Sequence, residues 1–84
     1  AAVPQYPQIT LNIPATPEEK TRKLASPELR EAEERARRSL SGRGKIIIRP
    51  SGTENLIRVT AEAEKEATAK KIVEELAEIL RNTP

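Results

Sequence analysis

The sequence predicts a two-layer α+β fold in which a small, mostly antiparallel sheet carries two helices on one face. Its 84 residues suffice for one small domain and are too few for two, so residues 1–84 are expected to form a single domain that begins with an extended lead-in over residues 1–7. Three short segments have the apolar pattern of strands, and two longer segments have that of helices. Their order is strand, helix, strand, strand, helix, which lets both helices pack on the same face of the sheet.

The three predicted strands differ in their apolar patterns. Residues 9–13 alternate between apolar and polar side chains, which is typical of a strand with one buried face. Residues 45–49 contain three consecutive isoleucines, which predict burial on both faces. Residues 56–62 alternate again, so that Ile57 and Arg58 are expected on opposite faces of the sheet.

The two predicted helices cover about residues 27–40 and 65–81. The first follows a Ser-Pro-Glu start signal at residues 26–28, and Gly42 suits the left-handed position just past its end. The second has a wide apolar stripe at helical spacing. A similar start signal, Thr-Pro-Glu-Glu at residues 16–19, predicts a short helical turn.

Composition excludes several classes of function. The chain has no cysteine and no histidine, so it cannot form a disulfide framework, a thiol nucleophile, a histidine base or the usual zinc sites. Its 13 acidic residues are all glutamates and are scattered, which argues against a magnesium site within the chain. No apolar run reaches the roughly 18 residues of a membrane helix, so we expect a cytoplasmic protein without a membrane partner.

The charge balance is mild. Fifteen basic residues against 13 acidic ones give a net charge of +2. Many of the basic residues follow a glutamate by four positions, which is typical of a solvated helix face. These predicted pairs are Glu31 and Arg35, Glu33 and Arg37, Glu34 and Arg38, and Glu66 and Lys70.

One segment departs from what packing alone requires. Residues 49–55, with the sequence Arg-Pro-Ser-Gly-Thr-Glu-Asn, stand between two predicted strands that a two-residue turn could join. The glycine permits close backbone approach and a positive φ, the hydroxyls offer donors, and the guanidiniums offer paired donors to phosphate oxygens. The segment therefore has the chemistry of a phosphate cradle. Its candidate ligands are Arg49, Ser51, Gly52, Thr53 and Arg58, with Glu54 and Asn55 as loop support.

A plainer interpretation of the same segment is a hydrophilic hairpin loop. Ser51 and Glu54 have the spacing of a helix capping box, which needs no ligand. The segment is neither a Walker loop nor a dinucleotide fingerprint, because Gly52 is isolated and no Gly-Lys-Ser/Thr follows it.

The same residues carry a resemblance to a known family. Residues 49–54 (RPSGTE) and 56–59 (LIRV) are similar to the phosphate-binding signature in the C-terminal domain of the phosphohexomutases. The flanking residues 42–44 and 61–64 resemble the segments before and after that signature. Residues 6–13 resemble the opening strand of this domain in phosphoglucosamine mutases, so the resemblance covers nearly the whole chain.

The resemblance implies a fold like that of the TATA-box-binding protein. It implies that Arg49, Ser51, Gly52 and Thr53 bind the phosphate of a phosphosugar directly, and that Arg58 assists. Phosphoglucosamine mutases interconvert glucosamine 6-phosphate and glucosamine 1-phosphate, and their phosphoserine and magnesium ion lie in other domains. The chain would then bind a phosphosugar or inorganic phosphate, would contact the remaining mutase domains, and would be inactive alone without a cofactor of its own.

Two other interpretations stay open at the level of sequence. A pI near 9.2 and strand arginines are compatible with a small nucleic-acid-binding domain, although the single aromatic residue, Tyr6, gives few bases a stacking partner. The regular glutamate–arginine pairs and the absence of cysteine, methionine and histidine are compatible with a structural or engineered scaffold. The chain departs from the family pattern at one position of the loop. The family commonly has proline where this chain has Asn55, which restores an N–H group to the loop.

Overall fold

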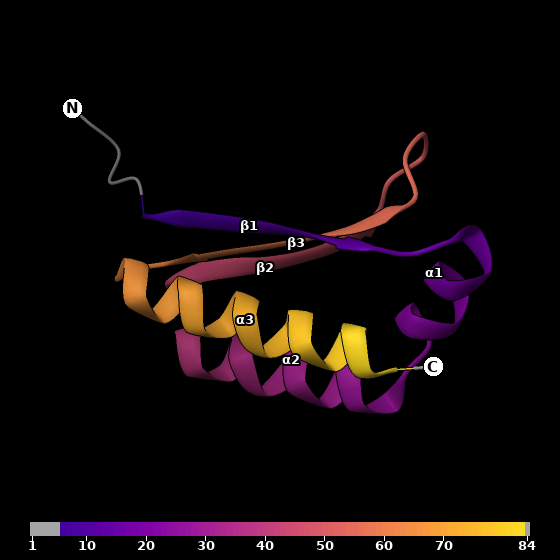
Figure 1. Ribbon diagram of the computed structural model, residues 1–84. Helices are drawn as coiled ribbons and strands as arrows, with labels where there is room; N and C mark the ends of the chain where they lie inside the picture. Colours follow the sequence, from indigo (N-terminus) through magenta and orange to yellow (C-terminus); the bar gives the residue numbers. More distant parts are fainter. Residues whose placement is uncertain (1–5, 84) are drawn as a thin grey trace.

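The sheet has three strands and is antiparallel throughout. The computed structural model describes residues 6–83, so residues 1–5 of the predicted lead-in lie outside it. Strand β3 is central and pairs with β1 on one side and β2 on the other (Figure 1). The elements are β1 (Gln8–Pro14), α1 (Pro17–Leu24), α2 (Pro27–Leu40), β2 (Gly44–Pro50), β3 (Leu56–Ala63) and α3 (Glu66–Asn82).

The predicted α+β fold class is confirmed. Helices α2 and α3 run side by side beneath one face of the sheet, while α1 lies at the end of the sheet nearest the β2–β3 connection (Figure 1). The predicted helical turn after residue 16 extends into a full helix of eight residues, so the sheet carries three helices.

The hydrophobic core lies between the sheet and helices α2 and α3. Alternate side chains of β3 point into it, and Ile57, Val59 and Ala61 have no exposed surface. The apolar stripe predicted for the last helix is the face of α3 that is buried against the sheet. Its buried residues are Ala69, Ile72, Val73, Leu76, Ala77 and Leu80.

The burial of β2 differs from the prediction. Ile46 is buried in the core, but Ile47 pairs with Thr60 on the opposite face of the sheet and is only half-buried. Within residues 6–83 no second layer covers that face, so the prediction of burial on both faces is wrong. The isoleucine run instead marks an edge strand with one buried side.

The structure shows capping at the start of α1 and at the end of α2. Thr16 and Glu19 form a capping box, in which the Glu19 carboxylate accepts from the Thr16 N–H at 3.0 Å and the Thr16 hydroxyl accepts from the Glu19 N–H at 3.2 Å. The Thr16 N–H, followed by the Thr16 hydroxyl, lowers the pKa of Glu19 below its ordinary value of 4.5. After α2, Ser41 takes the left-handed conformation directly past the helix, and Gly42, which was predicted there, follows with a positive φ as well.

The predicted ion pairs on α2 form in part. Glu33 pairs with Arg37 at 2.7 Å, and Glu34 pairs with Arg38 at 2.8 Å. Arg35 instead reaches across to Glu75 of α3 at 3.9 Å, so its predicted pairing along the helix is wrong. None of the helices in residues 6–83 has the length and apolar character needed to cross a bilayer.

Gly44 tests the tight pairing of β2 with β3. A Cβ at this position would overlap the backbone carbonyl oxygen of Glu62 in the central strand, which cannot swing aside. We expect Gly44→Ala to lower the free energy of unfolding by more than about 1 kcal/mol in urea denaturation. Gly52→Ala is the matched control, because a Cβ there meets nothing within 4 Å, and its effect should stay within about 0.5 kcal/mol. Equal midpoints for the two variants would contradict this packing.

Glu19 predicts a pH dependence of stability. Its pKa is lower in the folded chain than in the unfolded one, so its ionisation stabilises the fold above the unfolded pKa. This contribution is lost as the pH falls through the folded pKa. Glu19→Gln cannot titrate, so we expect it to be less stable than the parent near neutral pH and to approach the parent's stability as the pH falls through the folded pKa of Glu19. Urea unfolding across this pH range measures the difference, and a gap that persists in acid would rule out this origin.

Candidate phosphate site at the β2–β3 loop

The register of the sheet brings two arginines together. Arg49 of β2 and Arg58 of β3 are directly opposite each other in the antiparallel pairing. Opposite residues in an antiparallel pair point to the same face, and this face is the one away from α2 and α3, since Ile57 and Val59 on either side of Arg58 face the core. The two arginines therefore lie next to each other on one face of the sheet, beside the loop.

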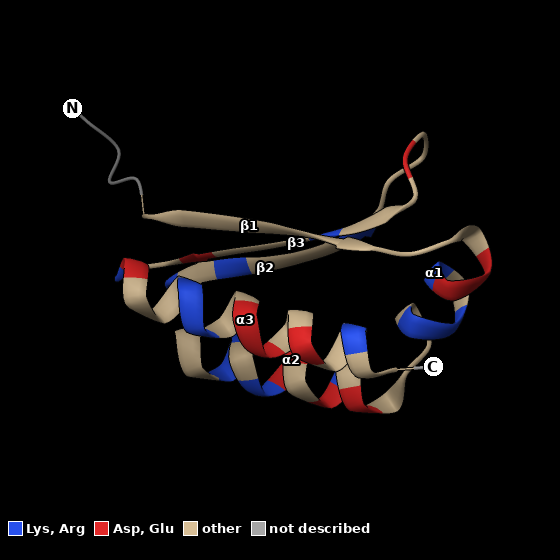
Figure 2. Cartoon of the chain, in the orientation of Figure 1, with Lys and Arg blue, Asp and Glu red and all other residues tan. Residues whose placement is uncertain are grey.

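This arginine pair has no acidic partner in the described chain. Both side chains are exposed, and neither takes part in an ion pair within residues 6–83. Figure 2 shows basic positions where the strands enter the loop and a single acidic position within the loop itself. Like charges directly opposite on a sheet destabilise it by roughly 0.2–1 kcal/mol, so an anion placed between the arginines would relieve a repulsion that the fold carries.

The β2–β3 loop (residues 51–55) is ordered by three hydrogen bonds of its own. The N–H of Ser51 donates to the carbonyl of Leu56 at 2.9 Å, and the N–H of Leu56 donates to the carbonyl of Glu54 at 2.9 Å. The Ser51 hydroxyl accepts from the N–H of Glu54 at 3.1 Å, which is one half of a capping box without a helix behind it. The Ser51 hydroxyl hydrogen stays available for donation.

Three backbone donors of the loop are left over. The N–H groups of Gly52, Thr53 and Asn55 donate to no acceptor within residues 6–83. Gly52 does not adopt the positive φ that glycine permits, since only Gly42 and Gly44 among the described glycines do so. A Cβ on Gly52 would meet nothing within 4 Å. Glycine therefore leaves open space at the loop surface and is not required by the backbone conformation.

A lysine that the sequence did not single out supports the loop from below. Lys20 of α1 donates from Nζ to the carbonyls of Ser51 and Glu54, at 2.7 Å each. The N–H of Ala15 also donates to the carbonyl of Asn55 at 2.9 Å. No sequence signal links Lys20 to a loop 31 residues away, and the predicted helical turn gave no reason to expect its side chain there.

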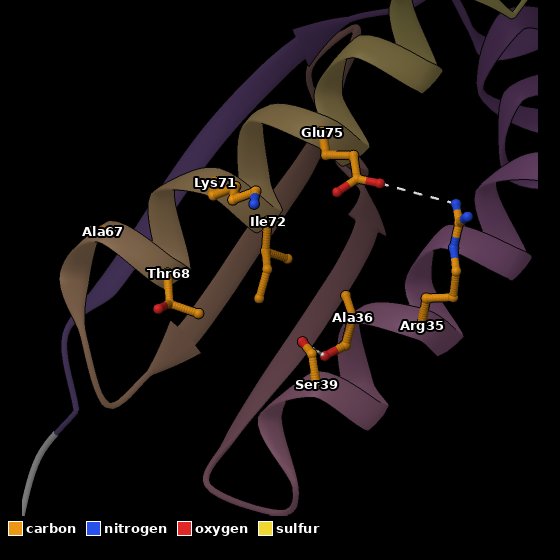
Figure 3. Close-up of a pocket in the computed structure, with 8 residues that line it drawn as sticks. All are labelled: Arg35, Ala36, Ser39, Ala67, Thr68, Lys71, Ile72 and Glu75. Atoms are coloured by element: carbon orange, nitrogen blue, oxygen red, sulfur yellow. Dashed lines mark hydrogen bonds and ion pairs between the residues drawn. The ribbon is translucent and has the colours of Figure 1, made fainter.

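A groove with a volume of about 580 Å³ lies between α2 and α3, away from the loop (Figure 3). The ion pair between Arg35 and Glu75 spans it, and the Ser39 hydroxyl donates to the carbonyl of Ala36 at 2.7 Å instead of facing a ligand. Arg35 is thus paired with an acid, whereas Lys71, the other basic residue that lines the groove, makes no ion pair within residues 6–83. Among residues 6–83, no group of three or more acidic side chains could hold a metal ion.

The comparison with protein families identifies the chain. Residues 11–79 match the family described as phosphoglucomutase/phosphomannomutase, C-terminal domain. The chain belongs to this family. The match includes the arginine pair and the whole β2–β3 loop.

Curated relatives and solved structures agree with this assignment. Phosphoglucosamine mutases from Thermus thermophilus and Renibacterium salmoninarum are 45% and 42% identical to the chain, over 95% and 94% of its length. The chain spans only 17% of each of these relatives. The crystal structure of Aspergillus fumigatus N-acetylphosphoglucosamine mutase in complex with GlcNAc-6P and magnesium superposes with a TM-score of 0.66 and 25% identity, over 92% of this chain and 16% of that one.

The repulsion within the arginine pair predicts an unusual mutant. Arg58→Gln removes one of two like charges and leaves the core face of β3 unchanged, so we expect the free energy of unfolding to rise by about 0.2–1 kcal/mol at low salt. The gain should shrink at high ionic strength because salt screens exposed charges. Arg37→Gln is the control, since it breaks an ion pair with Glu33 and should lose a few tenths of a kcal/mol. A clear loss of stability in Arg58→Gln would show that the two guanidiniums do not repel each other.

Proposed function

We propose that this chain is the phosphate-binding module of a phosphoglucosamine mutase, an enzyme that interconverts glucosamine 6-phosphate and glucosamine 1-phosphate. The observation that carries the proposal is the arginine pair, which has no acidic partner within residues 6–83 and stands beside a loop with three N–H groups that find no acceptor there. The curated relatives that resemble it over most of its length are phosphoglucosamine mutases, and this supports the choice of sugar.

The proposed ligand set combines three kinds of donor. The guanidiniums of Arg49 and Arg58 present planar, paired N–H groups to phosphate oxygens. The hydroxyls of Ser51 and Thr53 and the free N–H groups of the loop add neutral donors. Gly52 keeps the loop surface open so that the phosphate can approach the backbone. A phosphate dianion needs several donors at once, and these residues supply them from one end of the sheet.

The role that follows is positioning. In the proposed enzyme the loop holds the phosphate that is not reacting, and this binding energy orients the other end of the sugar. Phosphoryl transfer would use a phosphoserine and a magnesium ion in parts of the mutase beyond the segment that this chain spans. The chain alone is therefore expected to bind phosphate and to have no mutase activity.

A titration followed by NMR tests the proposal. Inorganic phosphate and glucosamine 6-phosphate are added separately to the ¹⁵N-labelled chain, and we expect the amide signals of residues 51–54 to move first. The dissociation constant should be about millimolar or weaker, because no other domain encloses the sugar. If the only shifts occur in the groove between α2 and α3, the loop is not the phosphate site.

Arginine variants sharpen the same titration. Arg49→Gln removes charge-assisted hydrogen bonds worth about 1.5–3 kcal/mol, so the affinity for phosphate should fall by at least about tenfold. Arg37→Gln removes the same charge from the far side of the molecule, on α2, and should bind phosphate as the parent does. Equal weakening in both variants would mean that net charge alone attracts the anion.

A further inference from the structure

Lys20 of α1 makes two short hydrogen bonds to the β2–β3 loop. The residue is half-buried, and its ammonium group donates to two carbonyls of that loop, those of Ser51 and Glu54, at 2.7 Å each. Hydrogen bonds from a charged donor are shorter and stronger than neutral ones. One side chain therefore holds both ends of a four-residue segment at a single point.

Because the peptide bond is planar, the two contacts of Lys20 also fix the directions of two N–H groups of the loop. In a trans peptide group the carbonyl and the following N–H point in opposite directions, and the described chain has no cis peptide bond. The carbonyl of Ser51 shares its peptide group with the N–H of Gly52, and the carbonyl of Glu54 shares its own with the N–H of Asn55. Since both carbonyls point at the Lys20 ammonium, the N–H groups of Gly52 and Asn55 both point away from it.

These are two of the three loop N–H groups without an acceptor in residues 6–83. Figure 1 shows the loop rising from the sheet on the side away from α2 and α3, with α1 below it. The arginine pair lies on the sheet face away from α2 and α3, which is the face from which the loop rises. Backbone N–H groups directed into one concavity bind anions.

We propose that Lys20 is a positioning residue, which fixes the peptide groups 51–52 and 54–55 so that the N–H groups of Gly52 and Asn55 face the phosphate. The proposal rests on the proposed function for the identity of the ligand. Lys20 does not touch the phosphate itself, since its ammonium is engaged with the carbonyls on the other side of the loop.

A second lysine on the same helix offers a contrast. Lys23 has only 4% of its surface exposed and donates to the carbonyls of Leu80 and Thr83 at the end of α3, at 2.5 and 2.7 Å. It therefore joins α1 to the core helix, whereas Lys20 joins α1 to the loop. Loss of Lys23 should lower the stability of the fold, and loss of Lys20 should change the loop.

The test compares Lys20→Met with Arg22→Met in the 84-residue chain. Arg22 is exposed on the same helix and makes no hydrogen bond to the loop, so its variant loses the same charge without losing the contact. In Lys20→Met we expect the affinity for inorganic phosphate to fall roughly tenfold, with the unfolding midpoint nearly unchanged. Arg22→Met should keep the parent affinity. Lys20→Gln, whose shorter neutral side chain cannot span both carbonyls, should behave as Lys20→Met does.

A second readout needs no ligand. In Lys20→Met the ¹⁵N order parameters of Gly52 and Asn55 should fall toward about 0.6 or below, while those of the strands stay near 0.85. If the parent binds phosphate and Lys20→Met binds it equally well, the role of Lys20 is refuted and the proposed function stands. If the parent does not respond to phosphate, the proposed function fails, and the order parameters alone decide whether Lys20 holds the loop.

Discussion

The antiparallel pairing of β3 with both neighbouring strands determines which side chains enter the core and which lie on the face of the candidate site. It places Ile57 and Val59 in the core and, by alternation, turns Arg58 to the opposite face beside Arg49. A slip of one residue would exchange the two faces, which would bury a guanidinium and expose isoleucine. The hydrophobic core and the position of the arginine pair are thus specified by the same register, and neither can change without the other.

Much of the fold was predictable because its signals are local. The period-two alternation of β3 and the broad apolar stripe of α3 each depend on burial of one face, and both are found as predicted. The prediction that β2 is buried on both faces was wrong because three apolar residues in sequence do not reveal whether a second layer covers the sheet. Arg35 misled for a related reason: Glu31 is near in sequence, but tertiary packing brings Glu75 of the neighbouring helix within reach.

The residues of the candidate site stay a prediction from the sequence, and the sequence said less about the shape of the loop that carries them. The loop composition and the two flanking arginines predict the donors, and strand pairing places the two arginines on one face of the sheet. Gly52 does not adopt the positive φ that glycine permits because the turn is closed by the Ser51 hydroxyl and strand hydrogen bonds, which need no left-handed residue. Lys20 was missed because a contact between residues 31 positions apart leaves no mark in either segment.

Because Lys20 supports the β2–β3 loop from a distant part of the sequence, the loop cannot be transferred to another protein by its own residues alone. A short stretch that contains the arginines, the hydroxyls and the glycine, once grafted onto a foreign hairpin, would bring along every donor side chain. It would leave behind the ammonium group of α1, together with the capping box that starts this helix. The transplanted backbone would then be free to rotate its peptide planes, and a motif search confined to adjacent residues would overlook the reason.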